Sequence, residues 1–101
     1  MDQRMLKQLQ QMQNKMMKAQ EDLANETVTA TSGGGAVTVE MNGHHEVKAV
    51  KIDPDAVDPS DIGMLEDMVL TAFNDALEKA QTLAQQKMGA ITGGLNIPGM
   101  F

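Results

Sequence analysis

Hydrophobic and polar residues alternate over residues 36–41 and again over residues 44–52, on either side of Asn42-Gly43. This pattern predicts a β-hairpin, and a two-residue type I′ turn would give both Asn42 and Gly43 a positive φ. A four-residue loop is the alternative, and it keeps the same side chains on the same face. Because residues alternate between the two faces of a strand, the hydrophobic ones share one face: Val37, Val39, Met41, Val50 and Ile52. Another element of the chain must therefore pack against this face of the predicted hairpin.

A third strand is predicted before the hairpin. Residues 26–32 show the alternation of β-branched residues that is typical of a strand, and Gly33-Gly34-Gly35 follows them. No Gly-Lys-Ser/Thr sequence follows these glycines, and the next element is a strand, so they form a turn rather than a phosphate-binding loop. The result is a three-stranded antiparallel sheet with short connections.

The first helix is predicted over residues 2–25, a segment without Gly or Pro. Its hydrophobic positions recur at alternating spacings of four and three: Met5, Leu9, Met12, Met16, Ala19 and Leu23. These six residues form a hydrophobic seam along the predicted helix. Such a seam is suited to packing lengthwise against another helix.

A second helix is predicted from Pro59 to Met88, with Asp58 as its N-cap. Gly63 costs a helix about 1 kcal/mol relative to Ala, so Met64 is the alternative first residue. The helix has one apolar stripe: Leu65, Met68, Val69, Ala72, Phe73, Ala76, Leu77, Ala80, Leu83 and Ala84. The alanines at every fourth position let another element approach closely.

The chain is predicted to leave the second helix at Gly89, a residue that often terminates helices. Gly93-Gly94 and Pro98-Gly99 then interrupt any regular pattern. We therefore expect one α+β domain over residues 1–89 and a flexible C-terminal tail over residues 90–101.

The predicted fold class is α+β, with a long N-terminal helix, a three-stranded antiparallel sheet and a long C-terminal helix. At 1.5 Å per residue the helices would be about 36 Å and 45 Å long, whereas three strands span only about 10–15 Å across the sheet. Both helices should therefore project beyond the sheet. A chain of 101 residues with two Phe and no Tyr or Trp has a small core, which favours a homodimer.

Charge is distributed unevenly along the chain, although the net charge is −6. Residues 1–20 carry a net charge of +3, and the remaining residues carry −9. Candidate DNA-binding residues are the cations that lie off the seam of the first helix, with two secondary candidates on the second helix: Arg4, Lys7, Lys15, Lys18, Lys79 and Lys87. Lys48 and Lys51 are weaker candidates, and a solvated outer face is the competing interpretation of the first four.

We find no pattern that indicates an enzyme, a cofactor, a metal site or a small-molecule substrate. The chain has no Cys, and the adjacent His44 and His45 would point to opposite faces of a strand. The acidic residues from Asp53 onward lack the Gly and the Glu that a calcium-binding loop needs at its sixth and twelfth positions. No apolar run approaches the roughly 18 residues of a membrane span, and we expect a cytoplasmic protein.

Several short strings, in their order and spacing, resemble the YbaB/EbfC family of bacterial nucleoid-associated DNA-binding proteins. The strings are Met41-Asn42-Gly43-His44, Ile52-Asp53-Pro54, Met64-Leu65-Glu66-Asp67-Met68-Val69 and Ala72-Phe73-Asn74-Asp75-Ala76. The resemblance covers nearly the whole chain. It implies a tweezer-like homodimer whose helical arms bind duplex DNA in the nucleoid, with effects on chromosome organisation and gene expression.

Two functions are consistent with these patterns. The first is binding of duplex DNA by a homodimer through basic residues on projecting helical arms, with little sequence specificity, because cations contact phosphates rather than bases. The second is a Met-rich helical module that binds a partner or client protein, because flexible Met surfaces suit adaptable interfaces.

Overall fold

The computed structural model describes residues 2–92. In chain order its elements are α1 (Gln3–Asn25), β1 (Thr27–Ser32), β2 (Val37–Asn42), β3 (Val47–Ile52), a short 3-10 turn η1 (Pro54–Ala56) and α2 (Ile62–Thr92). Two long helices and a three-stranded antiparallel sheet confirm the predicted α+β class.

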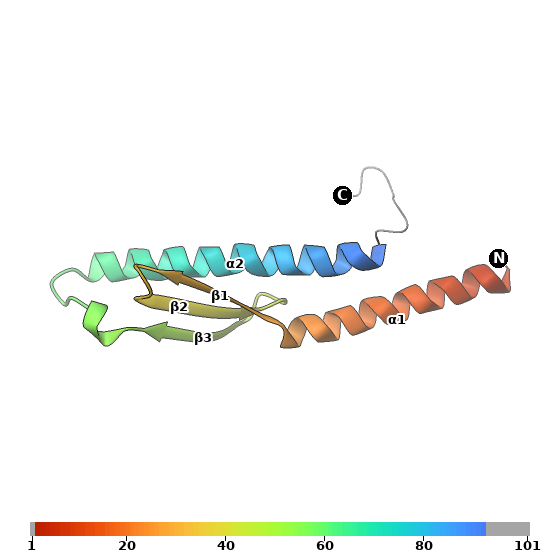
Figure 1. Cartoon of the computed structure of the whole chain (residues 1–101), viewed down its shortest axis with the longest axis horizontal. Helices are drawn as coiled ribbons and strands as arrows, with labels where there is room; N and C mark the ends of the chain where they lie inside the picture. Colours follow the sequence, from red (N-terminus) through yellow and green to blue (C-terminus); the bar gives the residue numbers. More distant parts are fainter. Residues whose placement is uncertain (1, 93–101) are drawn as a thin grey trace.

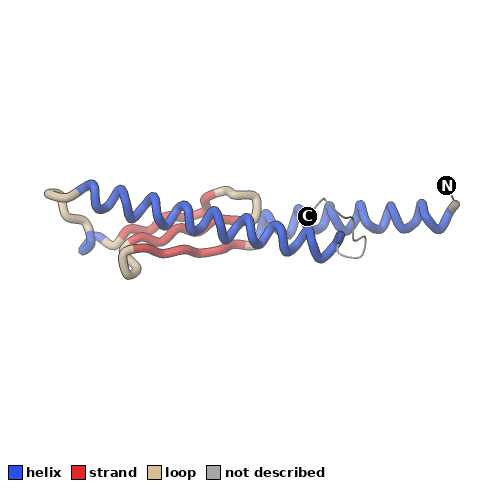
Figure 2. The backbone as a smooth tube through the Cα atoms, turned by 90° about the horizontal axis from the view of Figure 1, so that it is seen from above, coloured by secondary structure: helices blue, strands red, loops and turns tan. Residues whose placement is uncertain are grey.

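The molecule is elongated, with principal extents of 70 × 26 × 15 Å. Its radius of gyration is 19.2 Å, whereas a compact domain of this length has a value of about 13 Å. Figure 1 shows α2 along one face of the sheet and α1 leaving the far end of the sheet as an arm. Figure 2, which looks down on α2, shows that both helices extend beyond the strands, as their lengths predict.

The sheet has the order β1-β2-β3, and both neighbouring pairs are antiparallel. Gly33, Gly34 and Gly35 connect β1 to β2 with φ values of 61°, 68° and 97°. These left-handed conformations are readily available to glycine, and they confirm the predicted turn.

The β2–β3 connection differs from the type I′ turn predicted at Asn42-Gly43. Neither of these residues has a positive φ; His45 does, with φ of 65°. The strands are joined by the four residues 43–46, and the register shifts between Glu40 and Met41. The predicted hydrophobic face is retained, because Val39 pairs with Val50 and Val37 with Ile52.

The side chain of Asn42 is the physical reason for this longer connection. It is fully buried, and its Oδ1 accepts hydrogen bonds from the backbone N–H groups of His44 (2.9 Å) and Glu46 (3.0 Å). Its Nδ2 donates to the carbonyl oxygen of Ala24 (3.1 Å) and to Oε1 of Glu46 (2.9 Å). Asn42 therefore holds the loop and also ties it to the end of α1.

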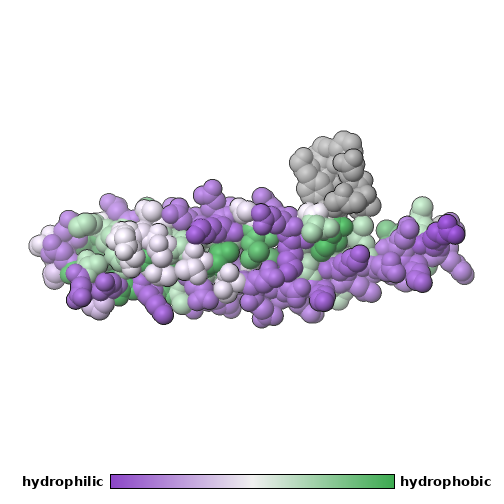
Figure 3. Space-filling view, in the orientation of Figure 1, coloured by the Kyte–Doolittle hydropathy of each residue, from purple (hydrophilic) through white to green (hydrophobic). Residues whose placement is uncertain are grey.

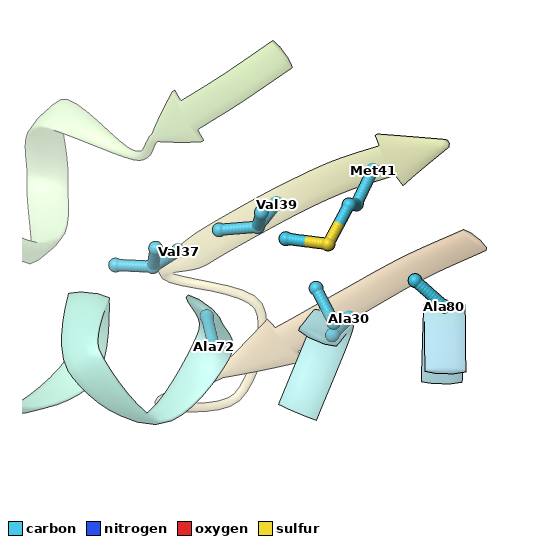
Figure 4. Close-up of a cluster of buried hydrophobic side chains, with 7 residues drawn as sticks. Ala30, Val37, Val39, Met41, Ala72 and Ala80 are labelled. Atoms are coloured by element: carbon cyan, nitrogen blue, oxygen red, sulfur yellow. The ribbon is translucent and has the colours of Figure 1, made fainter. Parts of the chain in front are cut away.

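The buried core lies between α2 and the first two strands (Figure 4). Strand β2 contributes Val37, Val39 and Met41, which point toward the helix. The alanines that recur every four residues along α2 meet them, together with one alanine of β1: Ala72, Ala76, Ala80 and Ala30. Their small side chains allow α2 to lie close to the sheet.

Helix α2 starts between the two predicted positions and ends later than predicted. It begins at Ile62 rather than at Pro59 or Met64, and the carboxylate of Asp61 caps it by accepting from the N–H of Met64 (3.2 Å). Asp58, the predicted cap, instead accepts hydrogen bonds from Ser60 (2.9 Å from N, 2.6 Å from Oγ) and so stabilises the preceding turn.

At its other end, α2 continues through Gly89 to Thr92. Gly89 does not adopt the positive φ that would terminate the helix. Residues 90–92 of the predicted tail are therefore helical, and residues 93–101 lie outside the described part of the chain. A single glycine can be accommodated in a helix at a cost of about 1 kcal/mol, and this helix tolerates it.

The hydrophobic seam predicted along α1 packs against the rest of the chain only at its C-terminal end. Ala19 and Leu23 are buried, whereas Met5, Leu9 and Met16 are exposed. At the other end, the carboxylate of Asp2 caps α1 by accepting from the N–H of Met5 (2.7 Å). The N-terminal part of the seam is thus largely uncovered in one copy of the chain.

Candidate nucleic-acid interface

The four predicted cations of α1 lie along one side of the arm. Arg4 and Lys7 are three residues apart, as are Lys15 and Lys18, and eleven residues separate the two pairs. Eleven residues are about three turns of an α-helix, or about 16 Å, so the two pairs lie one behind the other. All four side chains are exposed. They form a basic stripe that can contact more than one phosphate.

The base of this stripe borders a groove between α1 and the end of α2. The groove has a volume of about 440 Å³. It is lined by residues from both helices: Lys15, Lys18, Ala19, Asp22, Lys87, Ala90 and Ile91. Three of the six predicted DNA-binding residues are thus brought together across the two helices, which the sequence pattern alone did not indicate.

Lys87 already has two acidic partners. Its Nζ donates to Oε1 of Glu26 (2.5 Å) and lies 3.6 Å from Oδ2 of Asp22. The hydrogen bond with Glu26, followed by the charges of both carboxylates, raises the pKa of Lys87 above its usual value. These contacts join the end of α2 to the junction between α1 and β1. Lys87 therefore braces the base of the arm, and its charge is shared with two carboxylates.

Lys79 lies away from the groove. Its Nζ donates to the carbonyl oxygen of Thr29 (2.9 Å) on β1, which is an edge strand. The weaker candidates Lys48 and Lys51 are exposed on β3. The six predicted residues therefore divide into a stripe of four on α1, one brace at its base and one side chain over the sheet edge.

His44 also links the hairpin to α1. Its Nε2 is 2.7 Å from the carbonyl oxygen of Gln20, and the backbone N–H of Gly43 donates to the carbonyl oxygen of Leu23 (2.8 Å). Together with Lys87, these contacts hold the last turns of α1 on the sheet. The part of α1 before Ala19 has no such contact with the sheet, and Figure 3 shows hydrophilic residues over most of its visible surface.

Two other kinds of functional feature were sought in the described residues: a metal site and a membrane-spanning helix. Residues 2–92 contain no cluster of His, Asp and Glu side chains arranged to hold a metal ion. Neither helix within this range combines the length and the hydropathy of a membrane-spanning segment. What the basic stripe can do is neutralise phosphate charge, which releases counterions and gives salt-dependent binding.

The chain is similar in sequence to proteins of one DNA-binding family. A model of the YbaB/EbfC DNA-binding family matches residues 1–95. A nucleoid-associated protein of Chloroflexus aurantiacus is 54% identical over the full length of both chains. One of Pelotomaculum thermopropionicum is 52% identical over 97% of this chain and 93% of its own.

The fold also has a counterpart among solved structures. The crystal structure of an uncharacterized protein from Helicobacter pylori aligns with a TM-score of 0.65. The two chains are 24% identical in sequence, and the alignment covers 77% of this chain and 90% of the other. The arrangement of helices and sheet is therefore shared with that protein.

Proposed function

Since the chain belongs to the YbaB/EbfC DNA-binding family, we propose that it binds duplex DNA as a homodimer through the basic stripe of α1. The observation that carries this proposal is the position of the stripe. Arg4, Lys7, Lys15 and Lys18 are exposed on an arm that projects from an acidic body. Phosphates can approach the arm at a distance from the negative charge of the sheet and α2.

Low sequence specificity follows from the chemistry of these side chains. Lys and Arg that are spread along an exposed helix contact phosphates, which carry no sequence information directly. The chain has no Tyr or Trp, so it lacks the usual aromatic platforms for stacking on the bases of single strands. Arms that straddle a duplex would respond to its shape and deformability more than to its bases.

The names of the relatives suggest where this binding takes place. The proteins of Chloroflexus aurantiacus and Pelotomaculum thermopropionicum are named nucleoid-associated proteins. We propose the same location, the nucleoid of the bacterial cytoplasm, for this chain, with effects on chromosome organisation and gene expression. The family is one of DNA-binding proteins, and we propose no catalytic role.

A mobility-shift titration with random duplex DNA tests the proposal. The variant in which Arg4, Lys7, Lys15 and Lys18 are all replaced by Gln should remain folded and bind every duplex more weakly. Its log–log salt slope should become shallower by up to about 0.9 for each phosphate that the variant no longer neutralises.

The matched control compares two double variants with the same change in net charge. Lys15→Gln/Lys18→Gln should weaken binding, whereas Lys48→Gln/Lys51→Gln on β3 should have a smaller effect. The proposal is wrong if the α1 variants bind like the parent while Lys79→Gln or Lys87→Gln abolishes binding. In that case α2 carries the contact.

One observation favours a second candidate function, the binding of a partner or client protein. Met5, Leu9, Met16 and Met17 are exposed on the same arm, and flexible Met side chains adapt to varied partners. The same titration separates the two functions. A protein-binding module would give no shift of duplex DNA at low salt, whereas the DNA-binding function gives a shift that declines steeply as salt is added.

A further inference from the structure

Helix α1 is anchored to the rest of the described chain near its C-terminal end. Within residues 2–92 its buried side chains are Ala19 and Leu23, both in its last two turns. Arg4 lies 18 residues before Asp22, which is about 27 Å along the helix. A tilt of about 10° at the base would therefore move Arg4 by about 5 Å. This displacement exceeds the spacing of successive charges along one strand of duplex DNA, about 3.4 Å along the axis. The contacts at the base of the arm therefore decide where the basic stripe lies.

Helix α2 and the β2–β3 loop both contact α1 at this end. On α2, Nζ of Lys87 is 2.5 Å from Oε1 of Glu26 and 3.6 Å from Oδ2 of Asp22. In the loop, Nε2 of His44 is 2.7 Å from the carbonyl oxygen of Gln20. Asp22 and Gln20 belong to α1, whereas Glu26 is the residue that follows the helix. The contacts of Lys87 therefore span the junction at which α1 leaves the sheet.

The charges around Lys87 make it a poor contact for DNA. Its side chain is 24% exposed, and the two carboxylates beside it are more exposed, at 42% for Asp22 and 43% for Glu26. One cation and two carboxylates have a net charge of −1 together, which repels a phosphate. The geometry therefore suits Lys87 to linking α2 with the arm rather than to neutralising the DNA backbone.

We propose that Asp22 and Glu26 are positioning residues for DNA binding, which hold the arm at the angle that binding needs by bonding to Lys87. Two acidic side chains would then favour the binding of a polyanion, although their charges alone would oppose it. They act on the direction of the arm, because they lie at its base whereas Arg4 and Lys7 lie at its far end. This inference rests on the proposed function, and it assigns a role in DNA binding to residues that would not touch the DNA.

Two variants with the same change in net charge test this role. Glu26→Ala removes a carboxylate that bonds to Lys87. Glu21→Ala is the matched control, because Glu21 is exposed on the last turns of α1 and within residues 2–92 its carboxylate has no hydrogen bond or ion pair. In mobility-shift titrations at about 0.1 M salt, Glu21→Ala should bind duplex DNA more tightly than the parent, since a repulsive charge is lost. Glu26→Ala should bind about three- to eightfold more weakly, and the upper value corresponds to the loss of one phosphate contact at that salt concentration.

The direction of the arm can be measured without DNA. The chain has no Cys, so spin labels can be attached through Gln11→Cys on α1 and Gln81→Cys on α2, both at exposed positions. Labelled chains are diluted with unlabelled chains, so that the distance between the two labels is measured within one copy. The distribution of this distance should be broader or shifted in Glu26→Ala and unchanged in Glu21→Ala. Partly exposed ion pairs contribute little to overall stability, so both variants should keep the circular dichroism spectrum of the parent.

If the folded Glu26→Ala variant binds DNA as tightly as the parent or more tightly, Glu26 does not position the arm, although the proposed function stands. The positioning role is also wrong if Glu26→Ala weakens binding while the distance distribution is unchanged. Lys87→Gln should behave like Glu26→Ala, whereas Lys87→Arg, which can still bond to both carboxylates, should keep the affinity of the parent. If the parent protein binds no duplex DNA, or if the quadruple Gln variant of the basic stripe binds like the parent, the proposed function itself is wrong.

Discussion

Gly43 is where the β2–β3 loop meets the last turn of α1. A Cβ atom on Gly43 would lie 2.5 Å from Cδ2 of Leu23 and 2.9 Å from its carbonyl oxygen. The residue is therefore needed for close approach of two backbone segments, and not for a left-handed turn. The carbonyl oxygen cannot move without disturbing the end of the helix, and the N–H of Gly43 donates to it.

Gly43→Ala should lower the free energy of unfolding by about 1–3 kcal/mol, the usual cost of overpacking. Urea denaturation measures this change. Gly63→Ala is the control, because the nearest atom to a Cβ there is Oδ1 of Asp61 at 3.9 Å. That variant should be neutral or more stable by up to about 1 kcal/mol, since Ala is the better helix former. Equal effects of the two substitutions would contradict the close packing of Gly43 on Leu23.

The same residue shows how far sequence patterns reach. Alternation correctly placed the hydrophobic face of the hairpin, because face assignment depends only on the two-residue period of a strand. The predicted turn type was wrong. The conformation of the loop is set by the contacts of Asn42 with Ala24 and Glu46 and by the contact of Gly43 with Leu23. The contacts with Ala24 and Leu23 are made with α1, which is distant from the loop in sequence, so the turn propensities of Asn42 and Gly43 cannot predict them.

At the scale of elements, α2 is longer than its sequence signals suggest. Gly89 is followed by three more helical residues, and no atom beyond the helix's own backbone lies within 4 Å of the position its Cβ would take. Gly89→Ala should therefore raise the free energy of unfolding by about 0.5–1 kcal/mol. Thermal or urea denaturation can measure the sign of this change.

Gly34→Ala provides the contrast, because Gly34 also has no atom near its Cβ position but has a φ of 68°. Alanine there should cost about 1–2 kcal/mol, the cost of a left-handed conformation for a residue with a side chain. If Gly89→Ala is destabilising to the same degree, the helix ends at Gly89 as the sequence suggested, and Ala90 and Ile91 do not line the groove beside α1.

The candidate interface was only partly predictable for a related reason. The charge imbalance along residues 1–20 located the basic stripe, because a projecting helix keeps its sequence neighbours together in space. The sequence ranked Lys87 with Lys79 as a secondary candidate and gave no sign of its acidic partners. The fold separates it from them, since Asp22 and Glu26 are 61 or more residues away along the chain and yet bond to it.

At the scale of the whole molecule, the separation of charge along the 70 Å axis is the feature that, under the proposed function, would direct DNA to the arm. Charges on a solvent-exposed surface act over a Debye length, about 10 Å at 0.1 M salt. An acidic residue near the stripe should therefore oppose DNA binding, whereas an equal charge at the other end of the molecule should be screened. Glu21 on α1 and Asp67 near the start of α2 are both exposed and provide such a pair.

Glu21→Gln should strengthen binding of duplex DNA by about two- to fourfold, which corresponds to removing one repulsive charge about 5–10 Å from a phosphate in water. Asp67→Asn makes the same change in net charge and should alter the affinity much less. Titrations of both variants at about 0.1 M salt compare them directly, and the difference should shrink at higher salt as screening increases. If the two substitutions strengthen binding equally, the DNA does not lie along α1, because only overall charge would then matter. If Asp67→Asn has the larger effect, the contact lies at the sheet end of α2, and the basic stripe is a solvated face.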